Sequence, residues 1–311
     1  MMKDSNQKLC VIGSLNTDLV AQLEDFPKPG QTIIGNAFHT TFGGKGGNQA
    51  VALGKLGADV IMAGKVGRDT YGDNYLAHLK TCGVRSAVLR EDGISSGVAV
   101  IEVDKTAQNH IVVIPGANGL VDRAYIDEIL PEVSGCSVFL LQLEIPLETV
   151  EYAAKSLHDM GKTVILDPAP AVVLPDELLE NVDYITPNET ETEIVSGMSI
   201  KNEDDLKRAA AHLLEKGVKN VIAKAGGNGA YIINKKEFTH VPPYKVNPVD
   251  TTAAGDSFNA GLAFGLSRGL SLKDSVKIGN AVGGLATEAM GAQAAMPNAD
   301  AVRVCMNENL F

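Results

Sequence analysis

The chain has 311 residues, of which 45% are hydrophobic and 21% are charged, and its formal net charge is −11. This composition is ordinary for a globular protein with a packed core, and the negative charge disfavours nucleic acid and anionic membranes as partners. The N-terminus lacks the apolar stretch of a signal peptide, and no apolar run reaches the roughly 18 residues that a membrane span needs. We therefore expect a cytoplasmic protein.

The four cysteines lie far apart in the sequence, and the six histidines are equally scattered. No C-x-x-C pair is present, and no two histidines are four residues apart. A zinc site or a disulfide framework is therefore not expected, and the cysteines are interpreted as reduced thiols.

Short apolar runs alternate with segments of helical periodicity along most of the chain. Strands are expected at residues 9–12, 60–63, 138–143, 164–166, 184–186 and 221–223, and helices at 48–56, 71–81, 147–160 and 203–216. Apolar, partly β-branched strands that alternate with helices are typical of a parallel sheet with helices on both faces. The sequence therefore predicts an α/β fold.

Two regions interrupt this alternation. Residues 98–103 and 109–114 form an expected hairpin around a polar turn, and residues 17–42 are rich in β-formers, Pro and Gly without a helical period. No low-complexity linker or internal repeat divides the chain. We therefore expect a single domain, residues 1–311, with a small accessory sheet from about residues 14–42 and 96–115.

Polar side chains follow the first strand at Asn16 and Asp18, and a carboxylate follows a later apolar run at Glu144. Open α/β sheets bind ligands at the carboxyl ends of their strands. An amide and a carboxylate two residues apart suit vicinal hydroxyl groups. A local Asx-turn explains Asn16 and Asp18 equally well without a ligand.

A glycine-rich segment, G-G-K-G-G-N at residues 43–48, opens an expected helix. So many glycines indicate a tight turn or a close ligand, and Lys45 and Asn48 can donate hydrogen bonds to it. The segment is neither a P-loop nor a dinucleotide-binding fingerprint. A purely structural turn remains open.

Two further loops follow expected strands. In T-P-N-E-T-E, residues 186–191, Asn188 and Glu191 offer hard oxygen ligands for Mg²⁺ or its waters, although a helix-capping pattern explains them almost as well. The segment K-A-G-G-N-G, residues 224–229, is either a nucleotide loop or a plain hairpin turn.

The strongest motif is D-T-T-A-A-G-D-S-F-N at residues 250–259, where small residues lead to Asp256 at an expected helix start. Helix N-termini carry free N–H groups that bind anions, and a carboxylate there can accept a proton from a hydroxyl. Asp256 as a simple N-cap is the alternative. The A-A-G run and the second carboxylate, Asp250, favour the anion site.

These motifs together resemble the ribokinase family within the wider PfkB carbohydrate kinases. The similarity covers nearly the whole chain and includes N-T-D at 16–18, F-P-K-P-G at 26–30, G-G-K-G-G-N-Q-A at 43–50, P-G-A-N-G at 115–119, Q-L-E-I-P at 142–146, D-P-A-P at 167–170 and the two motifs ending at 191 and 259. The resemblance implies a ribokinase-like three-layer α/β/α fold with a mostly parallel sheet and a small β-sheet lid.

The resemblance also implies roles for individual residues. Asp256 is the implied catalytic base, and the backbone of Ala253, Ala254 and Gly255 forms the implied anion hole. The implied sugar-binding residues are Asn16, Asp18, Gly44, Lys45, Asn48, Ile111, Glu144 and Asp256. The implied nucleotide-binding residues are Asn188, Lys224, Gly226, Gly229, Gly255 and Asn280. Glu191 serves the Mg²⁺ region, and the implied K⁺ site comprises Asp250, Thr252, Ala286, Ala289, Gly291 and Ala295.

The chain departs from the family pattern at two of these positions. Lys224 stands where the family usually has Thr, and Ala295 stands where a hydroxyl or thiol side chain is common. The resemblance further implies a homodimer formed through the lid sheet.

The expected reaction is ATP-dependent phosphorylation of D-ribose at O5, with Mg²⁺ and K⁺. A kinase for 2-deoxyribose, another pentose or a nucleoside is the nearest alternative. A non-catalytic sugar-binding protein and a dinucleotide-dependent oxidoreductase are more distant ones, because a binder needs no base and the G-x-G-x-x-G loop is absent.

Overall fold

The computed structural model describes residues 7–106 and 108–307. Within these residues the main sheet has nine strands, in the order β13 (Phe238–Val241), β12 (Ala230–Ile233), β11 (Asn220–Lys224), β10 (Tyr184–Ile185), β9 (Thr163–Leu166), β8 (Cys136–Leu141), β1 (Lys8–Ile12), β4 (Val60–Gly67) and β5 (Arg85–Glu91). The pairs β11–β12 and β12–β13 are antiparallel, and the other neighbours are parallel. The predicted α/β fold is confirmed.

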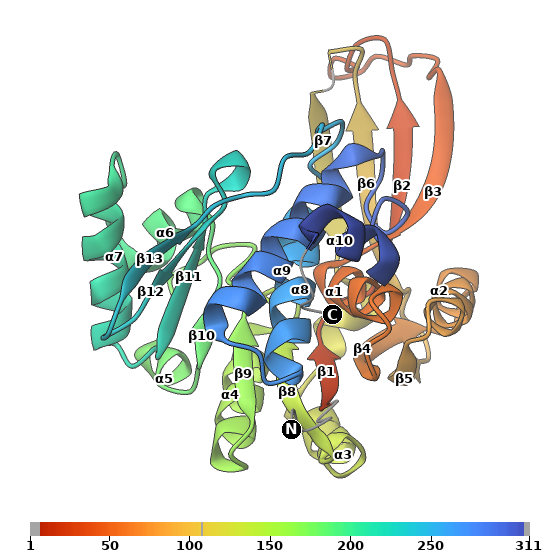
Figure 1. Ribbon diagram of the computed structural model, residues 1–311. Coiled ribbons are helices and arrows are strands. Elements are labelled where there is room, and N and C mark those ends of the chain that lie inside the picture. Colours follow the sequence, from red (N-terminus) through yellow and green to blue (C-terminus); the bar gives the residue numbers. More distant parts are fainter. Residues whose placement is uncertain (1–6, 107, 308–311) are drawn as a thin grey trace.

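Helices cover both faces of this sheet (Figure 1). One face packs against α1 (Lys45–Lys55), α2 (Thr70–Thr81), α8 (Ala254–Ser267), α9 (Leu272–Leu285) and α10 (Ala299–Met306). The other packs against α3 (Arg123–Val133), α4 (Leu147–Asp159), α5 (Asp176–Leu179), α6 (Glu189–Ser196) and α7 (Glu203–Glu215). Side chains of β1 alternate between the two cores: Leu9 and Val11 face the first, and Cys10 and Ile12 the second.

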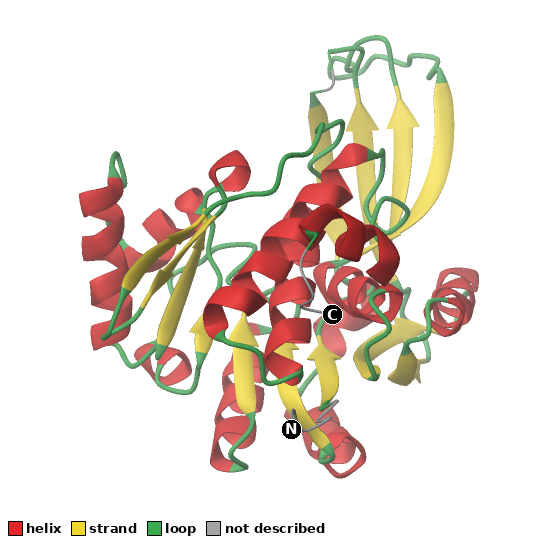
Figure 2. Cartoon of the chain, viewed as in Figure 1, coloured by secondary structure: helices red, strands yellow, loops and turns green. Residues whose placement is uncertain are grey.

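A smaller sheet projects from the end of the main one (Figure 2). Four strands of the described chain form it, in the order β3 (Ala37–Gly43), β2 (Asn16–Gln22), β6 (Gly97–Val103) and β7 (Asn109–Ile114). The strands β6 and β7 pair antiparallel, as predicted for the hairpin. All six residues of β7 are exposed, because β7 is an edge strand with no helix over it.

Several predicted boundaries were wrong by a few residues. The first helix starts at Lys45 rather than Asn48, because Gly44 adopts a φ of 81° as its N-cap. The helix that carries Asp256 starts at Ala254. The strand expected at residues 138–143 ends at Leu141, and the chain then turns so that Leu143 N donates to Ala169 O. Short 3₁₀ turns occur at Gly116–Leu120, Gly226–Asn228 and Ala286–Glu288.

No helix in the described ranges is both long and apolar enough to cross a membrane.

Candidate active site

Asp256 lies in the first turn of α8, at its third residue, and is only 5% exposed. The N-cap is Ala253, whose φ of 58° is left-handed and costs an alanine strain energy of the kind that is common at functional sites. The capping interpretation of Asp256 was therefore wrong. Among the described residues, the N–H groups of Gly255 and Asp256 find no hydrogen-bond acceptor. The start of α8 thus combines a carboxylate with free backbone donors.

Two amides from α1 hold the carboxylate of Asp256. Asn48 Nδ2 donates to Oδ2 at 2.9 Å, and Gln49 Nε2 donates to Oδ1 at 3.2 Å. Both amide side chains are buried. The glycine-rich segment therefore starts a helix that presents two donors to Asp256, and Asn48 is adjacent to Asp256 as its predicted role requires.

A second buried carboxylate, Asp167, follows β9 and shares the same amide. Gln49 Nε2 donates to Asp167 Oδ2 at 3.1 Å, and Gln142 Nε2 fixes the amide by donating to Gln49 Oε1 at 2.7 Å. Gln49, Gln142 and Asp167 lie in segments that resemble family motifs, but the sequence alone predicts no role for any of them. Gln49 lies on α1, Gln142 follows β8 and Asp167 follows β9, and these three elements lie next to one another in the fold.

Burial raises the pKa of Asp256 to about 6, with the charge of Lys45 opposing this rise and the charge of Asp167 adding to it. Burial alone would also raise the pKa of Asp167, but Lys224 and Lys45 outweigh it and hold that pKa below its ordinary value. The two carboxylates therefore differ in proton affinity, and Asp256 is the one suited to take up a proton near neutral pH.

Two glycines of the segment 43–48 are required by close packing. A Cβ atom on Gly44 would lie 2.7 Å from Asn16 N, and a Cβ on Gly46 would lie 2.7 Å from Ser14 N. The structural interpretation of this glycine turn is therefore correct, and the tight approach also places α1 against the ends of β1 and β2.

The predicted sugar-binding side chains gather near this junction. Asn16 is 3% exposed and its Oδ1 accepts a hydrogen bond from Asn118 Nδ2 at 2.7 Å. Glu144 Oε2 accepts from Ser14 Oγ at 2.6 Å and from Lys45 N at 3.0 Å. These contacts connect the strand ends predicted to bind hydroxyl groups.

Asp18 lies on β2, where burial, and then the charge of Glu144, raise its pKa to about 7. Ile111 lies on the edge strand β7 and is 54% exposed. Among the described residues, no hydrogen bond joins it to the other predicted sugar-binding residues. The structure brings together every predicted sugar-binding residue except Ile111.

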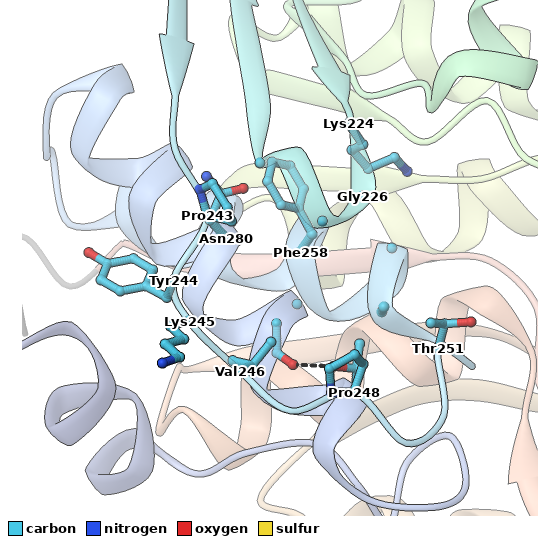
Figure 3. A pocket seen from close by; sticks show the side chains of 17 residues that line it. Lys224, Gly226, Pro243, Tyr244, Lys245, Val246, Pro248, Thr251, Phe258 and Asn280 are labelled. Atoms are coloured by element: carbon cyan, nitrogen blue, oxygen red, sulfur yellow. Dashed lines mark hydrogen bonds between the residues drawn. The ribbon is translucent and has the colours of Figure 1, made fainter.

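A cavity of about 610 Å³ opens beside the start of α8 (Figure 3). Among its lining residues are Lys224, Gly226, Gly229, Ala254, Gly255 and Asn280. Asp256 does not line it. Gly255 thus separates the cavity from the buried carboxylate that follows it in the chain.

The glycine loop 224–229 is a hairpin turn, one of the two interpretations that the sequence left open, and it also borders the cavity. It connects the antiparallel strands β11 and β12, and its Gly226 and Gly229 line the cavity. Asn280 on α9 reaches the opposite wall, where its Nδ2 donates to Val241 O and Pro242 O, each at 3.0 Å. These bonds hold the chain after β13 against α9.

Asn188 and Glu191 form a capping box at the start of α6. Asn188 Oδ1 accepts from Glu191 N, and Glu191 Oε2 accepts from Asn188 N, each at 2.8 Å. The predicted capping pattern is therefore confirmed. Lys224 Nζ lies 2.9 Å from Asp167 Oδ1 and 3.8 Å from Glu191 Oε2.

The predicted cation sites are of two kinds, one for Mg²⁺ and one for K⁺. No three His, Cys, Asp or Glu side chains gather into a metal site in the described ranges. Asp167 and Glu191 nevertheless supply hard oxygen atoms, which suit Mg²⁺ held mainly by phosphates and water.

The predicted K⁺ ligands lie on two loops, and Asp250 connects these loops through hydrogen bonds. Its Oδ1 accepts from Thr252 N at 2.9 Å, and its Oδ2 accepts from Gly291 N at 2.8 Å. Ala286 follows α9, and Ala289 and Ala295 lie on the same loop as Gly291. Ala295 has no side-chain oxygen, so any ligand there is its backbone carbonyl.

A residue that sequence reasoning missed, Gln293, orients Asn48 from this second loop. Gln293 Nε2 donates to Asn48 Oδ1 at 3.0 Å and to the hydroxyl of Tyr75 at 2.7 Å. Lys55 Nζ in turn donates to three carbonyls of the loop, including that of Gln293 at 2.7 Å. No local sequence pattern reveals this contact, because it joins residues 245 positions apart.

Comparison with known proteins gives a consistent result. The model of the pfkB family carbohydrate kinases matches residues 6–299. A ribokinase of Haemophilus influenzae is 35% identical over 290 residues, covering 93% of this chain and 95% of the relative. A deoxyribokinase of Salmonella typhi is 39% identical over 252 residues, covering 80% of this chain and 82% of the relative.

Solved structures agree with this assignment. The ribokinase of Arabidopsis thaliana, solved in complex with ribose and ATP, superposes with a TM-score of 0.92 at 31% identity. The match covers 97% of this chain and 99% of the other. The fold is thus ribokinase-like, and ATP is the nucleotide that the family implies. The chain belongs to the pfkB family of carbohydrate kinases.

Proposed function

We propose that the protein phosphorylates D-ribose at its O5 hydroxyl, using ATP and releasing ADP and ribose 5-phosphate. The observation that carries this proposal is the pairing of the Asp256 carboxylate with unbonded N–H groups at the start of α8, beside a large cavity. A base and an anion-binding backbone at one position are what phosphoryl transfer to an alcohol requires.

In the proposed reaction, the O5 oxygen forms a bond to the γ-phosphorus while the bond from that phosphorus to the bridging oxygen of ADP breaks. Asp256 accepts the proton from O5, and the N–H groups of Gly255 and Asp256 bind the negative charge on the transferring phosphoryl group. Asn48 and Gln49 keep the carboxylate oriented, since each donates to one of its oxygens. Because the carboxylate is buried, water has little access to compete with the sugar.

The remaining roles are assigned by position. We propose that Asn16, Asp18, Gly44, Lys45, Asn48 and Glu144 bind the sugar, with Ile111 closing over it from the small sheet. Asn280, Gly226, Gly229 and Lys224 line the cavity proposed for the nucleotide, and Asn188 and Glu191 serve its phosphate region. Mg²⁺ supplies charge neutralisation when bound there. The loops around Asp250, Thr252, Ala286, Ala289, Gly291 and Ala295 are proposed to hold K⁺.

We further propose that residues 1–311 act as one domain, in the cytoplasm, as a homodimer joined through the small sheet. Support for the dimer comes from apolar side chains that this sheet exposes, among them Phe38 at 66% and Val112 at 61%. Exposed apolar patches of this kind are typical of interaction surfaces. Light scattering on the purified protein tests the dimer, and a monomer at all concentrations would exclude it.

The direct test of the reaction is a coupled ADP-release assay over a panel of sugars, with ribose first and with K⁺ present or absent. The proposal predicts ribose-dependent ADP release that needs no other acceptor, and a product phosphorylated at O5. ADP release that does not depend on any sugar would contradict the proposed function.

The second candidate is 2-deoxyribose as the substrate, which the 39% identity to a deoxyribokinase favours. The two sugars differ in one hydroxyl group, so a site that hydrogen-bonds this group discriminates strongly between them. A higher kcat/KM for 2-deoxyribose than for ribose in the same assay would assign the protein to the second candidate.

A further inference from the structure

Tyr75 is a buried tyrosine to which the proposed reaction gives no role. It lies on α2, below the small sheet in Figure 1, and is 2% exposed. Its hydroxyl group donates to the carbonyl oxygen of Gly43, the last residue of β3, at 2.6 Å. Because a backbone carbonyl can only accept, the hydroxyl hydrogen is committed to Gly43. The Tyr75 oxygen is therefore an acceptor for its other neighbour.

That neighbour is the side-chain amide of Gln293. The group that lies 2.7 Å from the Tyr75 oxygen must be the NH₂ group of this amide, since the tyrosine hydrogen is already used. The same NH₂ group donates its second hydrogen to Asn48 Oδ1 at 3.0 Å. The amide oxygen of Gln293 faces His78 Nε2 at 2.9 Å, which fits an N–H at that nitrogen. The orientation of the Gln293 amide thus follows from the carbonyl of Gly43.

The same reasoning extends to Asp256. Asn48 Oδ1 accepts from Gln293, so Asn48 Nδ2 is the atom that faces Asp256 Oδ2, at 2.9 Å. A flipped Asn48 would present its carbonyl oxygen to the carboxylate. Two acceptors at this distance repel each other unless the carboxyl group carries a proton. The direction of one amide therefore decides whether the charged form of Asp256 is favoured.

A second buried tyrosine shows what a purely structural hydroxyl looks like in this fold. Tyr125 on α3 is also 2% exposed, and its hydroxyl group donates to the carbonyl of Ala87 at 2.9 Å. It belongs to the core on the opposite face of the main sheet. Tyr75 makes the same kind of bond to a backbone carbonyl, but its oxygen also starts a series of amides that ends at Asp256.

We propose that Tyr75 is a positioning residue for the phosphotransfer reaction: acting through Gln293 and Asn48, it holds an N–H donor rather than a carbonyl oxygen against Asp256. This inference rests on the proposed function, in which Asp256 is the base. Tyr75 acts only through the two amides and touches no reacting atom. The end of β3 in the small sheet is thereby connected to the base at the start of α8.

The variant Tyr75→Phe tests the proposal because it removes one oxygen atom and keeps the ring. The Gln293 amide then keeps His78 as a partner, and a neutral imidazole nitrogen can either donate or accept, so both orientations of Asn48 become accessible. Loss of a donor disfavours the charged form of Asp256, so its pKa rises and the acid limb of kcat/KM moves to higher pH. At about pH 5.5, kcat/KM should fall about 3–10-fold, while the plateau above about pH 8 stays within about twofold of wild type.

Tyr125→Phe is the matched control, because it removes an equally buried hydroxyl group that donates to a backbone carbonyl. It should leave the acid limb where it is, whatever its effect on stability. Neither substitution changes the titratable groups that face Tyr75, Gln293 and Asp256, which are Asp18, Lys45, His78, Glu144 and Asp167.

A measurement that does not need activity examines Asp256 itself. NMR on protein labelled with ¹³C in the aspartate carboxyl groups reports the pKa of Asp256, and the spectrum of Asp256→Asn identifies its signal. This pKa should rise in Tyr75→Phe, and by about one pH unit in Gln293→Met, which removes the donor to Asn48 altogether. In an Asn48→Leu background neither substitution should change it, because no amide remains to be oriented.

An unchanged Asp256 pKa in Tyr75→Phe would overturn the proposal. An equal shift in Tyr125→Phe, or a shift that persists in the Asn48→Leu background, would overturn it as well. If Tyr75→Phe does not fold, Gln293→Met decides by the same criteria. The proposed function fails separately: a wild-type protein that phosphorylates no sugar contradicts the reaction, while the NMR titration still decides how Asp256 is positioned.

Discussion

The two sides of Gly255 are built in different ways. On one side, Asp256 lies in a buried network of amides in which Asn48, Gln49 and Gln293 each have fixed partners. On the other side, the cavity is lined by six glycines and by side chains such as Lys224, Phe258 and Asn280, and the bonds of Asn280 hold main-chain carbonyls. The buried side thus depends on a few mutually bonded side chains, and the shape of the cavity depends more on the path of the backbone. Single substitutions should therefore be far more damaging on the first side.

The largest effect is expected for Asp256→Asn. Removal of a positioned base should lower kcat by about 10²–10⁴-fold, while the affinities for sugar and ATP stay close to wild type. Steady-state kinetics and calorimetry measure the two quantities. Asp122→Asn, which changes a capping residue of α3 to one that caps equally well, serves as the control. A variant with near-wild-type kcat would refute Asp256 as the base.

A smaller effect on turnover, with a clear effect on stability, is expected for Gln49→Leu. Loss of the Gln49 amide removes a hydrogen-bond donor from the buried carboxylates of both Asp167 and Asp256. It also leaves Gln142 Nε2 without its acceptor. Unsatisfied buried groups should lower the free energy of unfolding by about 1–3 kcal/mol, as measured by urea denaturation. Unchanged stability would show that the network does not hold these groups.

The pH dependence of kcat/KM should reflect the raised pKa of Asp256. A base must be ionised to act, and burial raises the pKa of Asp256 to about 6 against the opposing charge of Lys45. Activity should therefore fall about tenfold per pH unit below this value and level off above it. Asp18, with a pKa raised to about 7, also titrates in this range, and Asp18→Asn separates the two. A flat profile down to about pH 5 would contradict the prediction, since an unshifted carboxylate stays ionised there.

The smallest effect is expected in the cavity. Asn280→Ala removes two hydrogen bonds to the carbonyls of Val241 and Pro242, which shape one wall. The KM for ATP should rise about fivefold, because the loosened wall should weaken ATP binding by about 1 kcal/mol, with kcat unchanged. A large fall in kcat would show that both sides of Gly255 depend equally on side chains.

Much of the main sheet was predictable because its strands are buried on both faces and therefore consist of short apolar runs, as in β1 and β8. The glycine-rich and A-A-G motifs were also visible, since close backbone approach demands small residues. The roles of Gln49, Asp167 and Gln293 were not visible. Each depends on contacts between segments more than 100 residues apart, which no local pattern encodes.

The burial of the Asp256 side chain could not be predicted from the sequence either. A carboxylate at a helix start is usually an exposed cap, and its burial results from α1 lying against α8. The same packing keeps Asp256 out of the cavity lining, so in the proposed reaction the sugar approaches from the side of Asn48 and Lys45.

A crystal structure with ribose and a non-hydrolysable ATP analogue would examine this arrangement most directly. We predict the O5 hydroxyl within about 2.6–3.2 Å of an Asp256 carboxylate oxygen, with the terminal phosphate against the backbone of Gly255. A sugar bound elsewhere, with both amides still covering Asp256 and the phosphate remote from α8, would contradict it.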